Sequence, residues 1–248
     1  VSKILLDFNM SMNSQIIDLR SDTVTLPSED MLDAIKSVKL GDDVFSEDPT
    51  VNRLQEKAAS IMCKEDALLV PSGTMGNLVS ILAHCSRGDE VILGDQAHTF
   101  LYEAGGISAF GGIHSRQLKN NDDGTIDLDQ IEASIREENV HFPPTTLISL
   151  ENTHNRCFGA ALTPDYTSKV SEIAKKNNCT VHLDGARLFN ASVALDLDVK
   201  ELTKDVDSLT FCLSKGLSSP VGSIVCGTSD FIKKARHLRK ALGGGMRQ

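Results

Sequence analysis

The sequence predicts an α/β protein built on a mostly parallel sheet that helices flank on both faces. Short apolar runs alternate along the chain with longer segments of helical pattern, and strands separated by helices indicate βαβ units. With 248 residues, of which 40% are hydrophobic, the chain can bury the core of one large domain, or of one domain and part of a second.

The expected elements follow in order along the chain. The first helix is expected at residues 28–38, where Ser28 is a favourable N-cap, and the second at residues 50–62. Later helices are expected at residues 74–84, 128–137, 164–176, 188–194 and 231–242, and strands at residues 67–70, 90–93, 146–150, 180–183, 208–213 and 223–226. The glycine-rich residues 105–112 are interpreted as a flexible turn, and residues 1–16 as a disordered N-terminal extension.

Charge and cysteine content argue against several classes of protein. A net charge of −9 disfavours a nucleic-acid surface, which needs clustered Lys and Arg. The basic cluster at residues 233–240 is interpreted as a solvated face or a subunit contact. No apolar run is long enough to span a membrane. Six scattered cysteines, without a CxxC or a Cys/His metal spacing, fit a reduced cytoplasmic environment and predict no metal site.

Two of the expected strands each end in a single charged residue, and the two charges have opposite signs. The stretch VHLDGARLF places Asp184 after one strand, and TFCLSKGLSSPVGS places Lys215 after the next. Ligands bind at the carboxyl ends of the strands in parallel α/β sheets, so both charges fall on the edge where chemistry occurs. A surface salt bridge is the alternative interpretation.

The segment PSGT leads from the first expected strand into a helix. Ser72, Gly73 and Thr74 would offer an anion free N–H groups and the positive end of the helix dipole, and the glycine lets the backbone approach closely. Ser and Thr also cap helices that bind nothing. The segment alone therefore leaves phosphate binding and simple capping open.

Taken together, these strand ends predict a pyridoxal phosphate site. A lysine beside a phosphate site suggests a Schiff base with a phosphorylated aldehyde, and an acid on a neighbouring strand end is the partner of the pyridinium nitrogen in such enzymes. His98 follows the strand at residues 90–93 and could stack on the ring; a helix cap or an ordinary surface histidine is the alternative. On this hypothesis Asp184 and Lys215 face one cofactor rather than each other.

Several motifs carry a resemblance to a known family. They are DLRSDTVT, GDDVFSEDPTVNRL, PSGTMGN, AHTFLYEAGG, LISLENTHN, HLDGARLFNA, LSKGLSSPVGS and RKALGGGMRQ. In these motifs the chain resembles the low-specificity L-threonine aldolases, pyridoxal-phosphate lyases with the aspartate-aminotransferase (type I) fold. The resemblance extends from about Ile17 to Gln248, and it implies that residues 17–248 form the cofactor-binding large domain.

The resemblance implies cofactor-binding roles for matching residues. Lys215 matches the lysine that forms the Schiff base, Asp184 the partner of the ring nitrogen, and His98 the histidine stacked on the ring. The phosphate-binding turn is matched by Ser72, Gly73 and Thr74.

Substrate contacts are implied in the same way. Arg187 matches an arginine near the cofactor's phenolate oxygen and the substrate, and Ser21 matches a contact to the substrate carboxylate. His141, in VHFPPTT, matches a second histidine that approaches the substrate side chain. Three neighbouring charged residues are expected only to order loops: Arg20, Asp22 and Glu103.

The implied reaction is retro-aldol cleavage of L-threonine or L-allo-threonine to glycine and acetaldehyde by a homodimer or homotetramer. His98, His141 and a phosphate-bound water all remain candidates for the base that takes the β-hydroxyl proton. Two other functions stay open: another type I β-eliminating lyase, and a truncated chain that binds pyridoxal phosphate without catalysis.

The chain departs from the family pattern in two places. It ends at GGGMRQ, where family members continue into a small domain that carries a second arginine for the substrate carboxylate. We therefore expect the small C-terminal domain to be largely absent. Phe45 stands where relatives often place a tyrosine near a neighbouring subunit's site.

Overall fold

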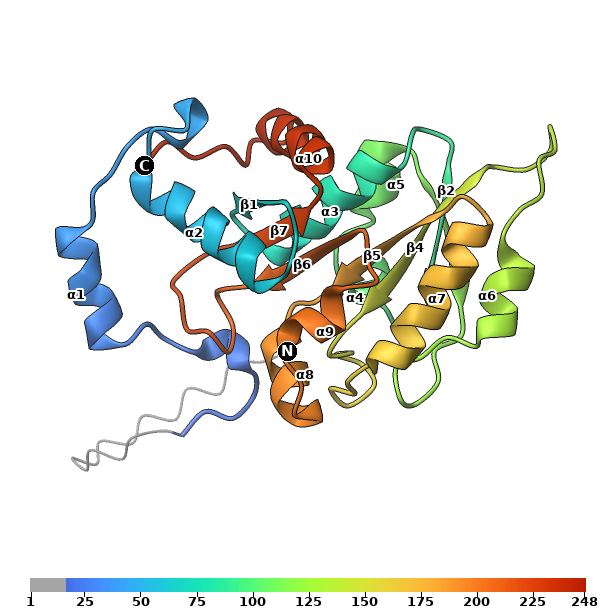
Figure 1. Ribbon diagram of the computed structural model, residues 1–248, viewed down its shortest axis with the longest axis horizontal. Helices are drawn as coiled ribbons and strands as arrows, with labels where there is room; N and C mark the ends of the chain where they lie inside the picture. Colours follow the sequence, from blue (N-terminus) through green and yellow to red (C-terminus); the bar gives the residue numbers. More distant parts are fainter. Residues whose placement is uncertain (1–16) are drawn as a thin grey trace, which may run out of the picture.

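The computed structural model describes residues 17–248, so the expected N-terminal extension lies outside the described residues. One seven-stranded sheet has the strand order β1-β7-β6-β5-β4-β2-β3 (Figure 1). Its strands are β1 (Asp66–Val70), β2 (Glu90–Gly94), β3 (His114–Leu118), β4 (Thr145–Glu151), β5 (Thr180–Asp184), β6 (Ser208–Cys212) and β7 (Ser223–Gly227).

Six of these strands run in one direction. The pairs β3–β2, β2–β4, β4–β5 and β5–β6 are parallel, whereas β7 is antiparallel to both of its neighbours, β6 and β1. β1 therefore points the same way as β2 to β6. These six carboxyl ends share one edge of the sheet, which confirms the predicted mostly parallel α/β architecture.

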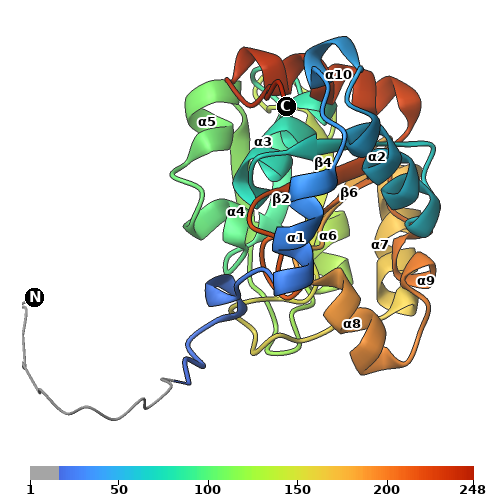
Figure 2. The same ribbon diagram turned by 90° about the vertical axis from the view of Figure 1, so that its left-hand side faces the viewer.

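Helices cover both faces of the sheet (Figures 1 and 2). α3, α5 and α10 pack on one face, and α2, α6, α7, α8 and α9 pack on the other. The helices are α1 (Glu29–Ser37), α2 (Pro49–Ile61), α3 (Gly73–His84), α4 (His98–Leu101), α5 (Gly106–Gly111), α6 (Leu128–Ser134), α7 (Pro164–Lys176), α8 (Leu188–Leu195), α9 (Val199–Thr203) and α10 (Ser229–Ala241). Among the described residues, none of these helices combines the length and apolar character needed to cross a membrane.

Alternate residues of the central strands enter opposite halves of the core. In β2, Ile92 packs with the layer of α6 and α7, whereas Val91 and Leu93 pack with the layer of α3 and α5. Because both faces of the strand are covered, its sequence is apolar at every position from Val91 to Leu93. This double burial is what made the central strands visible in the sequence.

The interpretation of residues 105–112 as a flexible turn was wrong. Residues Gly106–Gly111 form α5, and Ile107 anchors the helix in the core. Gly105 and Gly112 flank it with φ of 66° and 62°, in the left-handed region that glycine adopts without strain. The glycines therefore delimit a short helix instead of loosening the chain.

The basic cluster at residues 233–240 lies on α10 and is only partly a solvated face. Lys233, Lys234 and Lys240 are exposed. Arg239 is 3% exposed, and it donates to Asp43 Oδ2 at 2.7 Å and to the Leu69 carbonyl at 2.6 Å. One member of the cluster thus fastens α10 to the N-terminal segment and to β1.

Candidate active site

A cavity of about 220 Å³ lies at the carboxyl edge of the sheet, beyond the ends of β1, β5 and β6. Asp184 and Lys215 both face it, and within residues 17–248 no ion pair joins them. The alternative interpretation, a surface salt bridge between Asp184 and Lys215, is therefore wrong. The cavity is lined by Ser72, Gly73, Thr74, Asn77, His98, Glu103, Asp184, Ala186, Cys212, Ser214 and Lys215.

The N-terminus of α3 forms one wall of the cavity. Ser72 is the N-cap, and its hydroxyl accepts the Met75 N–H at 3.1 Å. The earlier N–H groups of a helix have no intrahelical acceptor, so those of Gly73 and Thr74 remain for a ligand. A Cβ on Gly73 would lie 3.0 Å from Cys212 Sγ and 3.7 Å from Ser223 Oγ, so a larger residue would fill this cradle. Ser223 Oγ is itself buried, with no partner among the described residues.

Asp184 ends β5 and is 4% exposed. Its Oδ2 accepts a hydrogen bond from Asn77 Nδ2 at 2.8 Å, and its Oδ1 accepts the Ala186 N–H at 3.2 Å. Both oxygens are thus fixed in place at the floor of the cavity. A carboxylate held in this way can accept a further N–H from a ligand.

Lys215 lies in the loop that joins β6 to β7. The loop is closed by the bond from Ser218 N–H to the Lys215 carbonyl at 2.9 Å. Thr25 Oγ1, from the N-terminal segment, donates to the same carbonyl at 2.6 Å. The backbone of Lys215 is therefore anchored on two sides, at a position where the residue lines the cavity.

His98 begins α4, and two carboxylates hold it. Its backbone N–H donates to Glu151 Oε2 at 2.7 Å, and its Nδ1 lies 2.8 Å from Glu103 Oε1. The bond to Glu103 raises the pKa of His98, and burial raises the pKa of Glu103. Because a carboxylate only accepts, Nδ1 carries the proton and Nε2 is the nitrogen left for a ligand.

Glu151 joins the loops that follow β2 and β4. It ends β4, is 6% exposed, and accepts the Asn155 N–H at 2.8 Å in addition to that of His98. Burial, and then the charge of Asp184, raise the pKa of this carboxyl. The sequence assigned Glu151 no role, although it lies within the quoted LISLENTHN motif.

Ser21 and Arg187 line a separate open hollow of about 310 Å³. Arg187 donates to both carboxylate oxygens of Asp22, at 2.8 and 2.6 Å, and thereby lowers the pKa of Asp22. Asp22 Oδ2 lies 3.8 Å from where a Cβ on Gly216 would stand, so this hollow adjoins the Lys215 loop. Asp22, expected only to order its loop, therefore holds a predicted site residue.

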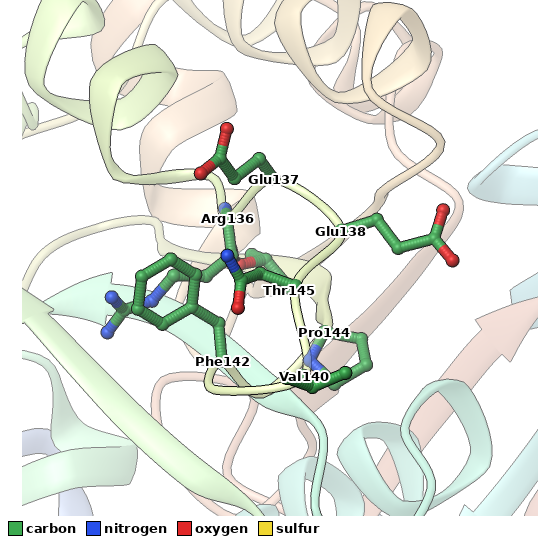
Figure 3. Close-up of a pocket in the computed structure, with 8 residues that line it drawn as sticks. Arg136, Glu137, Glu138, Val140, Phe142, Pro144 and Thr145 are labelled. Carbon is green, nitrogen blue, oxygen red and sulfur yellow. Dashed lines mark hydrogen bonds between the residues drawn. The ribbon is translucent and has the colours of Figure 1, made fainter.

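His141 does not join the site of its own chain. It is exposed and precedes Thr145, the first residue of β4, whereas Glu151 at the other end of that strand contacts His98. Its loop forms a different hollow of about 550 Å³, in which the Arg136 guanidinium lies 5.1 Å from the centre of the Phe142 ring (Figure 3). This hollow is at the amino edge of the sheet, opposite the Lys215 cavity.

Phe45 is not among the residues that line the Lys215 cavity. It is 67% exposed, and the Arg247 guanidinium lies 5.5 Å from the centre of its ring. Arg20, which was expected only to order its loop, is exposed and donates to both carboxylate oxygens of Asp18.

The donor set of the cavity fits pyridoxal phosphate. It offers an amine for an aldehyde, a fixed carboxylate for a ring nitrogen, and a helix N-terminus with a glycine cradle for a phosphate. Fold, site and family together define the class of pyridoxal-phosphate-dependent enzymes of type I fold. The chain belongs to the beta-eliminating lyase family, whose model matches residues 18–248.

Two relatives and one solved structure are similar to the chain. Low-specificity L-threonine aldolase 1 of Arabidopsis thaliana is 54% identical over 235 residues, which cover 94% of this chain and 66% of that protein. The low specificity L-threonine aldolase of Escherichia coli (strain K12) is 49% identical over 233 residues, covering 94% of this chain and 69% of that protein. The Leishmania major threonine aldolase structure shares the fold, with a TM-score of 0.77 at 21% identity, covering 92% of this chain and 67% of that one. The chain thus spans about two thirds of the length of these relatives.

Proposed function

We propose that residues 17–248 are the cofactor-binding domain of a pyridoxal-phosphate-dependent carbon–carbon lyase. The proposed reaction cleaves L-threonine or L-allo-threonine to glycine and acetaldehyde. The observation that carries the proposal is the meeting of Lys215, Asp184 and the N-terminus of α3 in one cavity. The two relatives at 54% and 49% identity, both named as L-threonine aldolases, support the choice of reaction.

Each group in the cavity has a proposed task toward the cofactor. Lys215 would hold its aldehyde carbon and Asp184 its ring nitrogen, while His98 would stack on the ring. The phosphate would bind at the start of α3, to Ser72, Gly73 and Thr74. When bound, pyridoxal phosphate withdraws the electrons left on Cα as the Cα–Cβ bond breaks.

The chain's own residues would orient the amino acid and move its proton. Arg187 and Ser21 line the hollow beside the Lys215 loop, where they would bind the substrate carboxylate. We propose His98 as the base for the β-hydroxyl proton, because it lies in the cavity and the Glu103 contact strengthens its affinity for a proton.

The proposed substrate role of His141 requires a second copy of the chain. Its position at the amino edge puts it out of reach of its own cavity, so the contact would be made in a neighbouring subunit of a homodimer or homotetramer. Mixing inactive Lys215→Ala and His141→Ala chains tests this arrangement, since a mixed dimer would regain one intact site. Activity that stays absent in mixed dimers shown to have formed would contradict it.

We further propose a cytoplasmic location, in keeping with the unpaired cysteines.

The cofactor assignment is tested by borohydride reduction with pyridoxal phosphate, followed by mass spectrometric mapping of the modified lysine. We expect label on Lys215 and none in the Lys215→Ala variant. Lys64 is the matched control. Burial lowers the pKa of its amine, so it would react with an aldehyde even without a cofactor site around it. Label on Lys64 in place of Lys215 would contradict the proposal.

The reaction is tested by product analysis with a panel of amino acids. Aldol cleavage yields glycine and acetaldehyde from threonine, whereas the β-elimination suggested by the family description yields pyruvate from substrates with a leaving group at Cβ, such as cysteine. Pyruvate without glycine would replace the aldolase assignment with a β-eliminating one. Label on Lys215 without any product would identify the chain as a binder of the cofactor only.

A further inference from the structure

Asn77 makes all four hydrogen bonds that an asparagine side chain can form. Its Nδ2 donates to Asp184 Oδ2 and to Glu103 Oε1, both at 2.8 Å. Its Oδ1 accepts from Thr210 Oγ1 at 2.9 Å and contacts His182 Nε2 at 3.3 Å. The amide has two donors and two acceptor sites, so its capacity is fully used. One side chain therefore bridges the two acids that line the floor of the cavity.

The position of Asn77 runs against local preference. It lies inside α3, is 1% exposed, and asparagine is a poor residue for a helix interior. Its neighbour Gly76 lets the helix approach the sheet, because a Cβ there would stand 3.0 Å from the Thr210 methyl group. The close approach brings the amide of Asn77 to the ends of β5 and β6. Burial removes the hydrogen bonds that this amide would make to water, so hydrogen bonds within the protein must replace them.

A chain of hydrogen bonds lies behind the amide oxygen of Asn77. His182 Nδ1 lies 2.8 Å from Ser208 Oγ, which lies 2.7 Å from His84 Nε2. Burial lowers the pKa of His182 to about 3 and that of His84 to about 4, so both rings are neutral at pH 7. Each ring then has one donor and one acceptor nitrogen.

The direction of every proton in this chain follows from the two acids. Carboxylates only accept, so Asn77 must turn its NH₂ toward Asp184 and Glu103 and its oxygen toward His182. His182 then donates through Nε2 and accepts the Ser208 hydroxyl at Nδ1. The Ser208 oxygen in turn accepts from His84 Nε2. All the donors point the same way, toward the acids.

We propose that Asn77 is a positioning residue that holds Asp184 against the ring nitrogen of the cofactor and, through Glu103, holds His98 against the ring. The inference rests on the proposed function and deepens it, since neither Asn77 nor its supporting chain touches the cofactor's reacting carbon. The Asn77 amide would thereby fix the positions of both Asp184 and His98, which contact different parts of the cofactor.

The test compares two cofactors that differ at one atom. Pyridoxal phosphate has a ring nitrogen, whereas its 1-deaza analogue has a C–H group there and gains nothing from Asp184. We expect Asn77→Leu, which keeps the branching of the side chain and removes its polar atoms, to weaken binding of pyridoxal phosphate about tenfold or more. The loss for the deaza analogue should be clearly smaller, and equilibrium dialysis measures both.

Asn120→Leu is the matched control. Asn120 is also buried, but within residues 17–248 its amide bonds only to the backbone, at Gln96 N–H and the Gly124 carbonyl. We expect this variant to lose stability without distinguishing between the two cofactors. It separates the general cost of an apolar substitution from an effect on Asp184.

A second pair of variants keeps the test valid if Asn77→Leu does not fold. Thr210→Val removes the hydroxyl that donates to Asn77 Oδ1 but preserves the shape of the side chain. We expect a loss of about threefold, selective for pyridoxal phosphate. Thr210→Ser keeps the hydroxyl and should restore wild-type affinity for both cofactors.

Equal losses for the two cofactors, or no loss in either set of variants, would overturn the positioning role of Asn77. Failure of wild-type protein to take pyridoxal phosphate onto Lys215 would instead overturn the proposed function, and this inference with it. The borohydride label on wild-type protein distinguishes the two results.

Discussion

At the scale of single residues, three buried acids surround one half-buried histidine. Glu103 and Glu151 both contact His98, and Asp184 shares the donor Asn77 with Glu103. Burial raises the pKa of Glu103 and of Glu151, because it disfavours their charged forms. The same surroundings favour the protonated form of His98. The site therefore holds a proton at the histidine more firmly than water would.

Replacing Glu103 by Gln should lower the pKa of His98, because the Glu103 contact is the largest cause of the upward shift. The raised pKa of His98 stabilises the folded protein. This stabilisation is fully present below the pKa of the histidine in the unfolded chain, and it is lost as pH rises through the pKa in the folded protein. The variant should lose that contribution at low pH. An NMR titration of the His98 ring measures the shift, with the exposed His237 as an internal control. An unchanged His98 titration would mean that Glu103 does not set it.

Several residues that line the cavity could be predicted from the sequence because strand ends are visible in it. Lys215, Asp184 and His98 were placed after apolar runs, and the cavity brings them together with the PSGT turn. Asn77 was overlooked because a helix pattern does not reveal which polar residue faces the sheet. A signal was nevertheless present: α3 is otherwise strongly apolar near that position, where an uncompensated asparagine would be costly.

At the scale of elements, the central feature is the close contact between α3 and the sheet. α3 packs on β5, β6 and β7, and Gly76 sits at the point of nearest approach. Thr210 cannot easily yield there, because its hydroxyl is bonded to Asn77 and its side chain is buried. The helix is thus held at a distance that brings both its N-terminus and Asn77 to the cavity.

Gly76→Ala should lower the free energy of unfolding by about 1 kcal/mol, since the crowding of the Thr210 methyl group outweighs the better helix propensity of alanine. Gly106→Ala in α5 is the matched control, because its Cβ would meet nothing closer than 3.6 Å. Urea denaturation of the two variants measures the difference. Stabilisation by Gly76→Ala would show that the contact can relax.

Elements were predictable where burial is two-sided or where caps are strong. The helix expected at residues 164–176 is α7, whose start is marked by the Thr163 cap and by Pro164 at its first position. β3 was missed because it is an edge strand of mixed polarity, and so it lacks the continuous apolar pattern of the inner strands. α9 was missed because its five residues are too few to establish a helical period.

At the scale of the whole molecule, the buried His182 and the partly buried His84 link stability to pH. His84 stacks on Phe231 with ring centres 4.6 Å apart, and His182 is 0% exposed. Their folded pKa values, about 4 and about 3, lie below the ordinary value of 6.5. Between those values the unfolded chain binds more protons than the folded one, so the histidines make the protein less stable as pH falls.

Lowering the pH from 7 to 5 should therefore cost about 2 kcal/mol through His84 alone, given about 1.4 kcal/mol for each pKa unit. His84→Gln cannot titrate, and its loss of stability over this range should be smaller than that of the wild type. The raised pKa values of Glu103 and Glu151 make the folded protein more stable as pH falls, which opposes the effect of His84. The quantity to compare is therefore the difference in pH dependence between the wild type and His84→Gln. Exposed His237→Gln should behave as wild type in the same urea titrations.

The strand order has a consequence for how the protein is made. β1 leads into the PSGT turn and pairs only with β7 within the described sheet. In the sequence, 152 residues lie between Val70 at the end of β1 and Ser223 at the start of β7. A ribosome releases β1 early, but that strand has no partner until β7 has emerged. A nascent chain that ends between Lys215 and Ser223 thus already carries Lys215 and Asp184, whereas its PSGT turn is not yet held at the edge of the sheet. We therefore expect the cavity to form only after synthesis has passed the last strand of the sheet.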